Sequence, residues 1–501
     1  ATASKGSDVM SLISINNLTF SYDTSYDNIF ENVSFQIDTS WKLGLTGRNG
    51  RGKTTFLNLL MGRYEYSGSI RASVTFDYFP YAVSDQSCDA IGVVSRIVPH
   101  FEQWMLQREL SLLDVGEEAL YRPFSTLSNG EQTKILLAAL FLKENNFLLI
   151  DEPTNHLDMN ARRIVGDYLN SKKGFILVSH DRALLDQCID HILSINRNNI
   201  EIQKGNFSTW QYNKELQDRF ELAENEKLKK EIKSLAAAAQ RTARWSDRVE
   251  KTKKGNRLSG VKPDKGYIGH QAAKMMKRSK CLEARQENAI EEKSKLLKNI
   301  ETSDSLSIKP LAYHNSRLAE AENLSILYDG NAVAEGVNFT INEGDRIALI
   351  GKNGSGKSSL LKLIMGEEIA FRGNLRIGSG LILSYIPQDT SCLKGNLKQF
   401  ARDEAVDESL LKAILRKLDF ERVQFEKDMA EFSEGQKKKV LIAKSLCQQA
   451  HLYIWDEPLN FIDVISRIQI EELLQNHKPT MIFVEHDRAF CDAVATKKIF
   501  L

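Results

Sequence analysis

Apolar and polar side chains alternate at the start of two widely separated parts of the chain. LISINNLTFSYD, from Leu12, and AENLSILYDG, from Ala321, place apolar residues at about every second position. This spacing predicts strands with one buried face. The uninterrupted apolar runs that follow them lead into a glycine-rich loop or end in Asp-Glu. Such runs are typical of strands covered on both faces of a parallel sheet, so the pattern predicts α/β domains.

Four motifs occur twice, in the same order, at an offset of 304 to 306 residues. They are GRNGRGKTT (47–55) and GKNGSGKSS (351–359), LSNGEQ (127–132) and FSEGQK (432–437), LLIDEPTNHLD (148–158) and YIWDEPLNFID (453–463), and SHDRA (179–183) and EHDRA (485–489). One offset for four motifs indicates a duplicated domain. We expect a first domain at 1–210, a linker at 211–316 and a second domain at 317–501, with residues 1–9 a cloning remnant.

Both glycine-rich loops have the spacing GxxxxGK[ST], which suits a nucleotide phosphate. Glycines let backbone N–H groups turn toward phosphate oxygens, and the following helix offers its positive end. The lysine is expected to reach the β- and γ-phosphates, and the hydroxyl of Thr54 or Ser358 to bind Mg²⁺. The expected loop contacts to ATP are Gly47, Asn49, Gly50, Gly52, Lys53, Thr54 and Thr55, and Gly351, Asn353, Gly354, Gly356, Lys357, Ser358 and Ser359.

An Asp-Glu pair ends the second apolar run in each copy. Asp151 and Asp456 are expected to hold Mg²⁺, and the glutamate that follows each of them to orient and polarise the attacking water. A histidine after the next apolar run is expected to sense the γ-phosphate. The alternatives are a strand cap and a packed histidine, but the neighbouring loops favour chemistry. The predicted catalytic residues are Glu152, Glu457, His180 and His486.

The segment between the copies predicts a projecting basic hairpin. From Gln211, a stripe through Leu216, Phe220 and Leu228 indicates a long helix without Pro or Gly, and a second helix is expected at about 269–300. Residues 241–280 hold 13 Lys and Arg against 3 Asp and Glu, although the whole chain has a net charge of only +1. Basic charge at the end of an arm indicates contact with a nucleic-acid backbone. The candidate tip residues are Lys254, Arg257, Lys262, Pro263, Lys265 and Tyr267.

Composition excludes several other classes of protein. A charged fraction of 27% fits a globular protein, and six scattered cysteines without a CxxC pair predict neither a zinc site nor a disulfide framework. No apolar stretch is long enough to span a membrane, and no signal peptide is expected. We therefore expect a cytoplasmic protein with free thiols.

LSNGEQ and FSEGQK resemble the signature motif of ATP-binding-cassette (ABC) proteins. In that family two domains stack head to tail, so the resemblance implies two composite ATP sites. Site one would pair Lys53 with Ser433, and site two would pair Lys357 with Ser128. The resemblance also implies an adenine-stacking aromatic near the start of each copy and a glutamine ahead of the signature that reaches ATP and Mg²⁺. The residues implied in these roles are Tyr22, Tyr328, Gln388, Ser128, Gly130, Ser433 and Gly435.

The two copies differ in ways that predict unequal sites. Tyr81 stands where the second copy has Gln388, and Glu434 replaces the usual signature glycine. A tyrosine cannot reproduce the metal coordination of an amide. Both departures fall in site one, so we expect it to turn over more slowly than site two.

Fused cassettes, a charged helical linker and PTNHLD at 153–158 together resemble the ABC-F family of translation factors, although the second copy departs with PLNFID. WKLGLTGRNGRGKTT, FELAENEK, AAKMMKRSK and LYIWDEPLNFID carry a resemblance to its Lsa-type members. This implies a monomer that uses ATP and Mg²⁺, binds the E site of the bacterial ribosome and extends its linker tip toward large-subunit rRNA and the P-site tRNA. It further implies resistance to lincosamides, pleuromutilins and streptogramin A.

Three other interpretations stay open. A membrane importer subunit can also fuse two cassettes, although a basic hairpin would be of no use to it. A housekeeping ABC-F factor would share every motif. A non-catalytic ATP-gated scaffold is disfavoured because both Glu152 and Glu457 are present.

Overall fold

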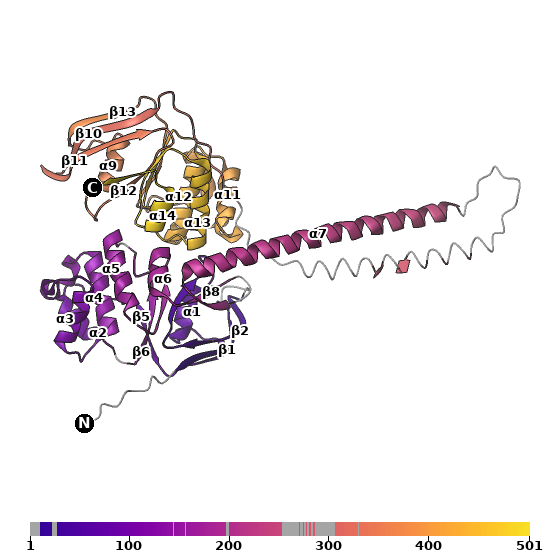
Figure 1. The fold of residues 1–501 in the computed structure, drawn as a ribbon, viewed down its shortest axis with the longest axis horizontal. Coiled ribbons are helices and arrows are strands. Elements are labelled where there is room, and N and C mark those ends of the chain that lie inside the picture. The colour runs from indigo at the N-terminus through magenta and orange to yellow at the C-terminus, as the bar shows by residue number, and fades with distance from the viewer. Residues whose placement is uncertain are drawn as a thin grey trace. The chain divides into compact units, whose positions relative to one another are not determined.

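The computed structural model describes residues 11–22, 28–143, 145–155, 157–196, 200–252, 306–328 and 330–501, together with 270, 274, 277, 280–281 and 284–285. The chain divides into two units (Figure 1). One unit comprises Ala1–Trp210 and Ser303–Leu501, and the other is the linker, Gln211–Thr302. The predicted fold class, two P-loop α/β domains with a helical linker, is confirmed.

The first cassette contains two sheets. A three-stranded antiparallel sheet has the order β2-β1-β4, and a six-stranded sheet has the order β5-β6-β7-β3-β8-β9, in which only the β8–β9 pair is antiparallel. The strands are β1 (Leu12–Phe20), β2 (Phe30–Asp38), β3 (Lys42–Thr46), β4 (Ser67–Arg71), β5 (Thr75–Phe79), β6 (Asn146–Asp151), β7 (Phe175–Val178), β8 (His191–Ile195) and β9 (Ile200–Lys204). The helices are α1 (Lys53–Leu60), α2 (Ala90–Ile97), α3 (Gln103–Leu112), α4 (Asn129–Phe141), α5 (Met159–Asn170) and α6 (Arg182–Cys188), with short 3-10 turns at Glu117–Tyr121 and Phe124–Thr126.

The second cassette repeats this topology. Its antiparallel sheet has the order β11-β10-β13, and its parallel sheet has the order β14-β15-β16-β12-β17. The strands are β10 (Arg317–Tyr328), β11 (Asn331–Asn342), β12 (Arg346–Ile350), β13 (Phe371–Ile377), β14 (Leu383–Ile386), β15 (Leu452–Asp456), β16 (Met481–Val484) and β17 (Lys497–Phe500). The helices are α9 (Lys357–Ile364), α10 (Leu397–Asp403), α11 (Glu408–Lys417), α12 (Glu434–Cys447), α13 (Val464–His477) and α14 (Arg488–Val494), with 3-10 turns at Arg422–Glu426 and Met429–Glu431.

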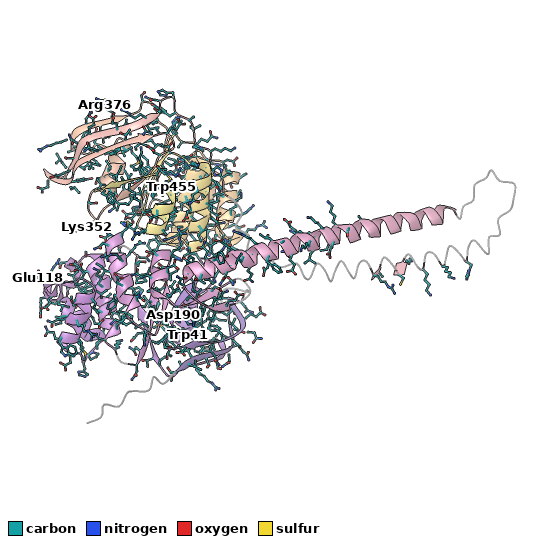
Figure 2. The ribbon with its side chains drawn as sticks, viewed as in Figure 1. Trp41, Glu118, Asp190, Lys352, Arg376 and Trp455 are labelled. Carbon is teal, nitrogen blue, oxygen red and sulfur yellow. The ribbon has the colours of Figure 1, made fainter. Side chains whose placement is uncertain are left out.

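Each cassette has two apolar clusters, one on either side of its parallel sheet. Trp455 of β15 (labelled in Figure 2) is fully buried in the second cassette. Its indole N–H donates to Ser445 Oγ at 3.0 Å. Trp41 of the first cassette stacks on His191 with ring centroids 4.0 Å apart. These clusters fix the strand ends, from which the phosphate-facing loops emerge.

Helix α7 begins inside the first unit and continues into the linker. Helix α7 covers Phe207–Thr252, so it begins four residues before Gln211, because Phe207 and Trp210 are buried in the first cassette. At 1.5 Å per residue, its 46 residues span about 69 Å. At the other end, Leu306 and Ile308 are buried in the second cassette, which therefore starts before residue 317. Most of the expected second helix lies outside the described residues.

Candidate nucleotide sites

Each glycine-rich loop folds around its own lysine. Lys53 Nζ donates to the carbonyl oxygens of Gly47 (2.7 Å) and Arg48 (3.1 Å), and Lys357 Nζ does the same at Gly351 (2.9 Å) and Lys352 (2.7 Å). Burial lowers the pKa of both lysines. The amines are thus held inside their loops, where phosphate oxygens would compete for them.

Glycine is required at the start of these loops because the chain passes close to a neighbouring strand or chain segment. A Cβ on Gly47 would lie 2.7 Å from the carbonyl oxygen of Ile195, and one on Gly351 would lie 2.7 Å from that of Leu501. The last loop glycines, Gly52 and Gly356, have φ of 90° and 86° and directly precede α1 and α9. The free N–H groups of both helices therefore open into the loops.

The paired aspartates end β6 and β15, beside the first turns of α1 and α9. Thr54 Oγ1 donates to Asp151 Oδ2 at 3.1 Å, and Tyr78 donates to the same oxygen at 2.9 Å. In the second cassette, Ser358 hydrogen-bonds Asp456. Asp456 Oδ1 is buried and has no hydrogen-bond partner within the described residues. Burial raises the pKa of both carboxyls.

These oxygens fit a hard cation. Mg²⁺ is commonly held by one or two protein oxygens, with water and phosphate completing the shell. The described residues contain no cluster of three or more His, Cys, Asp or Glu suited to a metal. The hydroxyl–carboxylate pairs Thr54–Asp151 and Ser358–Asp456 supply the one or two protein oxygens that commonly hold Mg²⁺. Oδ1 of Asp456, which has no hydrogen-bond partner among the described residues, is suited to such a cation.

The second acidic residue of each pair has an unusual backbone. Glu152 and Glu457 have φ of 50° and 48°, in the left-handed region that non-glycine residues seldom occupy. Their backbone N–H groups are fixed to Val178 O and Val484 O at 2.9 and 3.0 Å. Strain of this kind is concentrated at functional sites. Here it turns the glutamate out of the strand direction.

Glu457 is held by three side chains. Its Oε2 accepts from Gln388 Nε2 at 3.0 Å and from Asn460 Nδ2 at 2.7 Å, and its Oε1 lies 3.2 Å from His486 Nε2. Burial alone would raise the pKa of Glu457, but His486 and Gln388 outweigh it and lower the pKa. The carboxylate is therefore kept charged and oriented.

Glu152 has a different environment. His180 Nε2 lies 3.4 Å from its Oε1, and among the described residues Tyr81 makes no hydrogen bond to it. Burial, together with the charge of Asp151, raises the pKa of Glu152 to about 8. Burial also lowers the pKa of His180 well below its usual range, with Lys53 adding to the effect. The surroundings thus favour the charged form of Glu457 and the neutral form of Glu152.

The signature serines start long helices. Ser128 precedes α4 and Ser433 precedes α12, and each takes part in a capping box, with Glu131 and Gln436 respectively. Both serines are exposed. Each helix thus presents an N-terminus with its remaining N–H groups to an anion.

Glu434, the departure in the second signature, is paired within its own cassette. Thr390 Oγ1 donates to its Oε2 at 2.6 Å, and Lys437 Nζ lies 3.1 Å from its Oε1. The hydrogen bond from Thr390 does most to lower its pKa. Its negative charge is therefore partly balanced locally.

One cavity joins the second P-loop to the first signature. It has a volume of about 830 Å³, and Ser128 and Gly130 lie on one wall while Lys357, Glu457 and His486 lie on the other. Tyr328, Ser358, Ser359 and Gln388 also line it. The first P-loop meets the second cassette likewise: Asn49 Nδ2 donates to Phe461 O at 2.9 Å, and a Cβ on Gly435 would lie 3.0 Å from Asn49 Nδ2. Each P-loop thus faces the signature of the other copy.

The two tyrosines lie beside their P-loop helices. The hydroxyls of Tyr22 and Thr55 are 2.8 Å apart, and Tyr328 donates to Ser359 at 3.0 Å. Both rings remain more than a third exposed. Both rings are placed where a base could stack on them.

The six candidate residues of the linker tip lie outside the described residues.

Sequence reasoning missed Asn460, although it could have been found. An Asn follows Asp-Glu-Pro-x in both copies, as Asn155 and Asn460, and this recurrence was a usable signal. It also missed the buried ion pair between Lys439 and Asp463, 2.8 Å apart, because a lysine within a signature helix has no distinctive spacing.

Comparison with known proteins identifies relatives over nearly the whole chain. The profile of the ABC transporter family matches residues 30–155 and 334–460. The ribosome protection protein VmlR of Bacillus subtilis (strain 168) is 28% identical over 490 residues, covering 96% of this chain and 85% of VmlR. The ABC transporter F family member 2 of Arabidopsis thaliana is 26% identical, covering 98% and 77% of the two chains.

Solved structures share the fold. The archaeal ribosome recycling factor aABCE1, in complex with the stalk protein aP1, matches with a TM-score of 0.62 and 18% identity, covering 97% of this chain and 87% of that chain. In the described parts of the present chain, no helix is sufficiently long and apolar to cross a membrane.

Proposed function

Because this chain belongs to the ABC transporter family, within which its relatives are ABC-F proteins, we propose that it is an ATP-driven clamp that binds the bacterial ribosome. In the ATP-bound state it enters the E site and extends its linker toward the peptidyl-transferase centre. There it protects against lincosamides, pleuromutilins and streptogramin A, as an Lsa-type factor would. The ATPase domains imply ATP hydrolysis.

The observation that carries the clamp is the shared cavity at site two. ATP bound there would contact Lys357 of one cassette and the helix end at Ser128 of the other. ATP that contacts both walls favours the closed form, and hydrolysis of ATP removes that contact. Ser358 and Asp456 would hold Mg²⁺, with Gln388 as a further ligand, and the ion would supply positive charge next to the phosphates.

Hydrolysis at site two would use the oriented carboxylate. Glu457 is charged and fixed by three donors, so it can align a water molecule and accept its proton. His486 would face the γ-phosphate from the other side. Site one has Lys53, Thr54 and Asp151 in the same places, with Ser433 opposite.

Unequal turnover is part of the proposal. Glu152 lacks an amide partner at Tyr81, and burial beside Asp151 raises its pKa and so favours its protonated form. A protonated carboxyl is a poor acceptor of the water's proton. We therefore assign the slower turnover to site one. The local pairing of Glu434 makes that residue a smaller contributor than Tyr81.

The ribosomal part rests on the relatives and on the linker. VmlR carries ribosome protection in its name. The linker region 241–280 has a net charge of +10 from its 13 basic and 3 acidic residues. Such a charge excess favours an RNA backbone over a membrane-embedded partner. The tip residues Lys254 to Tyr267 would approach the drug site and the P-site tRNA.

Two experiments test this proposal. A Glu152→Gln, Glu457→Gln double variant, which would trap ATP, should cosediment with ribosomes when ATP is present, and it should not do so without nucleotide. Recovery with membranes instead would favour an importer subunit.

The second experiment separates resistance from housekeeping. A sensitive bacterium would express either the intact chain or a deletion of residues 248–268. Only the intact chain should raise the inhibitory concentrations of the three drug classes. Equal susceptibility of the intact strain and the empty host would refute resistance and leave the housekeeping role.

A further inference from the structure

Direct bonds join the first P-loop to the second cassette. Arg51 Nη2 lies 3.5 and 3.4 Å from Oδ1 and Oδ2 of Asp419, and Arg48 Nη1 lies 3.8 Å from Oδ2. Asn49, between the two arginines, donates to Phe461 O at 2.9 Å. Three of four successive loop positions therefore contact the opposite cassette.

The second P-loop has a different composition at these positions. At the repeat offset, Arg51 corresponds to Ser355 and Arg48 to Lys352. Arg48 is only 7% exposed, whereas Lys352 is an exposed residue. Within the described parts of the chain, Asp114, the counterpart of the aspartate, forms no ion pair with the second cassette. The arginine contacts are therefore confined to site one.

The aspartate is equally well placed in both copies. Asp419 follows α11 with φ of 60°, and Asp114 follows α3 with φ of 53°. Each helix end thus presents a carboxylate in the same local geometry. The difference between the sites comes from the P-loops, because Arg51 brings Nη2 close to both oxygens of Asp419, whereas Ser355 at the matching position carries no charge.

Burial makes these ion pairs stronger than ordinary surface pairs. The side chains of Arg48, Arg51 and Asp419 are 8%, 21% and 26% exposed. Ions that are partly removed from water are less screened by salt than exposed ions. Two arginines around one carboxylate also form a small network rather than an isolated pair.

A second one-sided ion pair connects the cassettes. Arg182 of α6 pairs with Glu471 of α13, and both side chains are largely buried, at 12% and 16% exposure. The counterpart Arg488 pairs instead with Asp492 in its own helix, and Gly166 stands where a carboxylate would be needed. This ion pair between the cassettes therefore also lacks a counterpart at the matching positions of the other copy.

We propose that Arg48, Arg51 and Asp419 form a latch that keeps the walls of site one together when ATP is absent, so that the clamp opens at site two. The inference rests on the head-to-tail pairing of the proposed function but does not depend on ribosome binding. Without nucleotide, site two loses the ligand that bridges its walls. Site one keeps its ion pairs, and nucleotide exchange there is slower.

Distance measurements on the full chain test the latch. Non-natural amino acids carrying spectroscopic labels would be placed at exposed positions, Glu65 with Arg422 across site one and Glu368 with Glu117 across site two. Label attachment by this route avoids the six cysteines. Without nucleotide, the site-one distribution should match that measured with a non-hydrolysable ATP analogue. The site-two distribution should broaden toward longer distances.

Variants identify the residues responsible. Arg51→Ser and Asp419→Asn should each broaden the nucleotide-free site-one distribution, lowering its closed-to-open ratio about two- to fivefold, as expected for an ion pair of this exposure. Arg51→Lys should restore closure only in part, because the positive charge remains but the shape and reach of the guanidinium are lost. Asp114→Asn, the matched control, should leave both distributions unchanged. Ser355→Arg should narrow the site-two distribution by recreating the pair with Asp114.

Nucleotide kinetics give an independent measurement. In a Glu457→Gln background, where only site one hydrolyses ATP, Arg51→Ser should raise the KM for ATP about two- to fivefold, more than it changes kcat. Thermal unfolding would confirm that the variants are folded. The latch is wrong if wild-type site one opens as far as site two without nucleotide, or if both Arg51→Ser and Asp419→Asn leave site one unchanged. Failure of ribosome cosedimentation would overturn the proposed function and leave the latch intact.

Discussion

Exchanging one residue between the two copies should exchange the activities of their sites. Gln388 Nε2 donates to Glu457 Oε2 at 3.0 Å, and the first copy has Tyr81 at this position. A hydrogen bond to a charged group contributes roughly 1.5–3 kcal/mol. Since 1.36 kcal/mol corresponds to tenfold in rate, Gln388→Tyr should lower kcat at site two by about 10- to 100-fold. Asn460 still holds the same oxygen, which favours the lower end of this range.

The assay isolates each site before comparing them. Phosphate release at saturating ATP would be measured for Gln388→Tyr in a Glu152→Gln background, where only site two is active. The reciprocal Tyr81→Gln, in a Glu457→Gln background, should raise turnover at site one. Gln399→Ala, which removes an exposed amide bonded to Asp403 at 2.8 Å, is the control and should leave kcat unchanged. An unaltered kcat in Gln388→Tyr would refute the role assigned to this amide.

Four further predictions concern stability, the signature helix and the metal. Asp463→Ala should lower the free energy of unfolding by about 3–5 kcal/mol in urea titration, because it leaves Lys439 charged and buried without its partner; a loss below about 1 kcal/mol would contradict this. Trp455→Ala should lower the free energy of unfolding by a similar 3–5 kcal/mol, because it empties a fully buried position. An unchanged free energy of unfolding would contradict the burial assigned to Trp455. Ser128→Ala should lower stability by only about 1 kcal/mol, through loss of a helix cap, yet abolish most turnover in the Glu152→Gln background. EDTA should stop phosphate release, and added Mg²⁺ should restore it; activity that persists in EDTA would argue against the proposed metal.

Much of the fold follows from the sequence because the repeat is explicit. The offset between motifs predicts two α/β domains with P-loops at strand ends, and the comparisons confirm both cassettes and the ABC-F relationship. Within one cassette, buried strands bring Asp151 close to Thr54 although 97 residues separate them. Parallel strands end at one edge, so such proximity is predictable.

Contacts between the two copies could not be predicted from the sequence. Arg51 and Asp419 are 368 positions apart, and nothing in their local spacing marks them as partners. Their meeting depends on how two folded domains dock. Similarly, Thr390, which donates to Glu434, lies 44 residues before it, and no local spacing indicates that contact, whereas Lys437 is only three positions away in the same helix.

Placing both copies in one polypeptide allows each site to evolve separately. In a homodimer of identical cassettes, a single codon change that creates an arginine at the position of Arg51 would appear in both P-loops at once. The fused chain can carry Arg51 in one copy and Ser355 in the other. A heterodimer could do the same only by keeping two gene products in balance. Fusion therefore makes inequality between the sites heritable as one unit, and a substitution that slows one site need not disable the other.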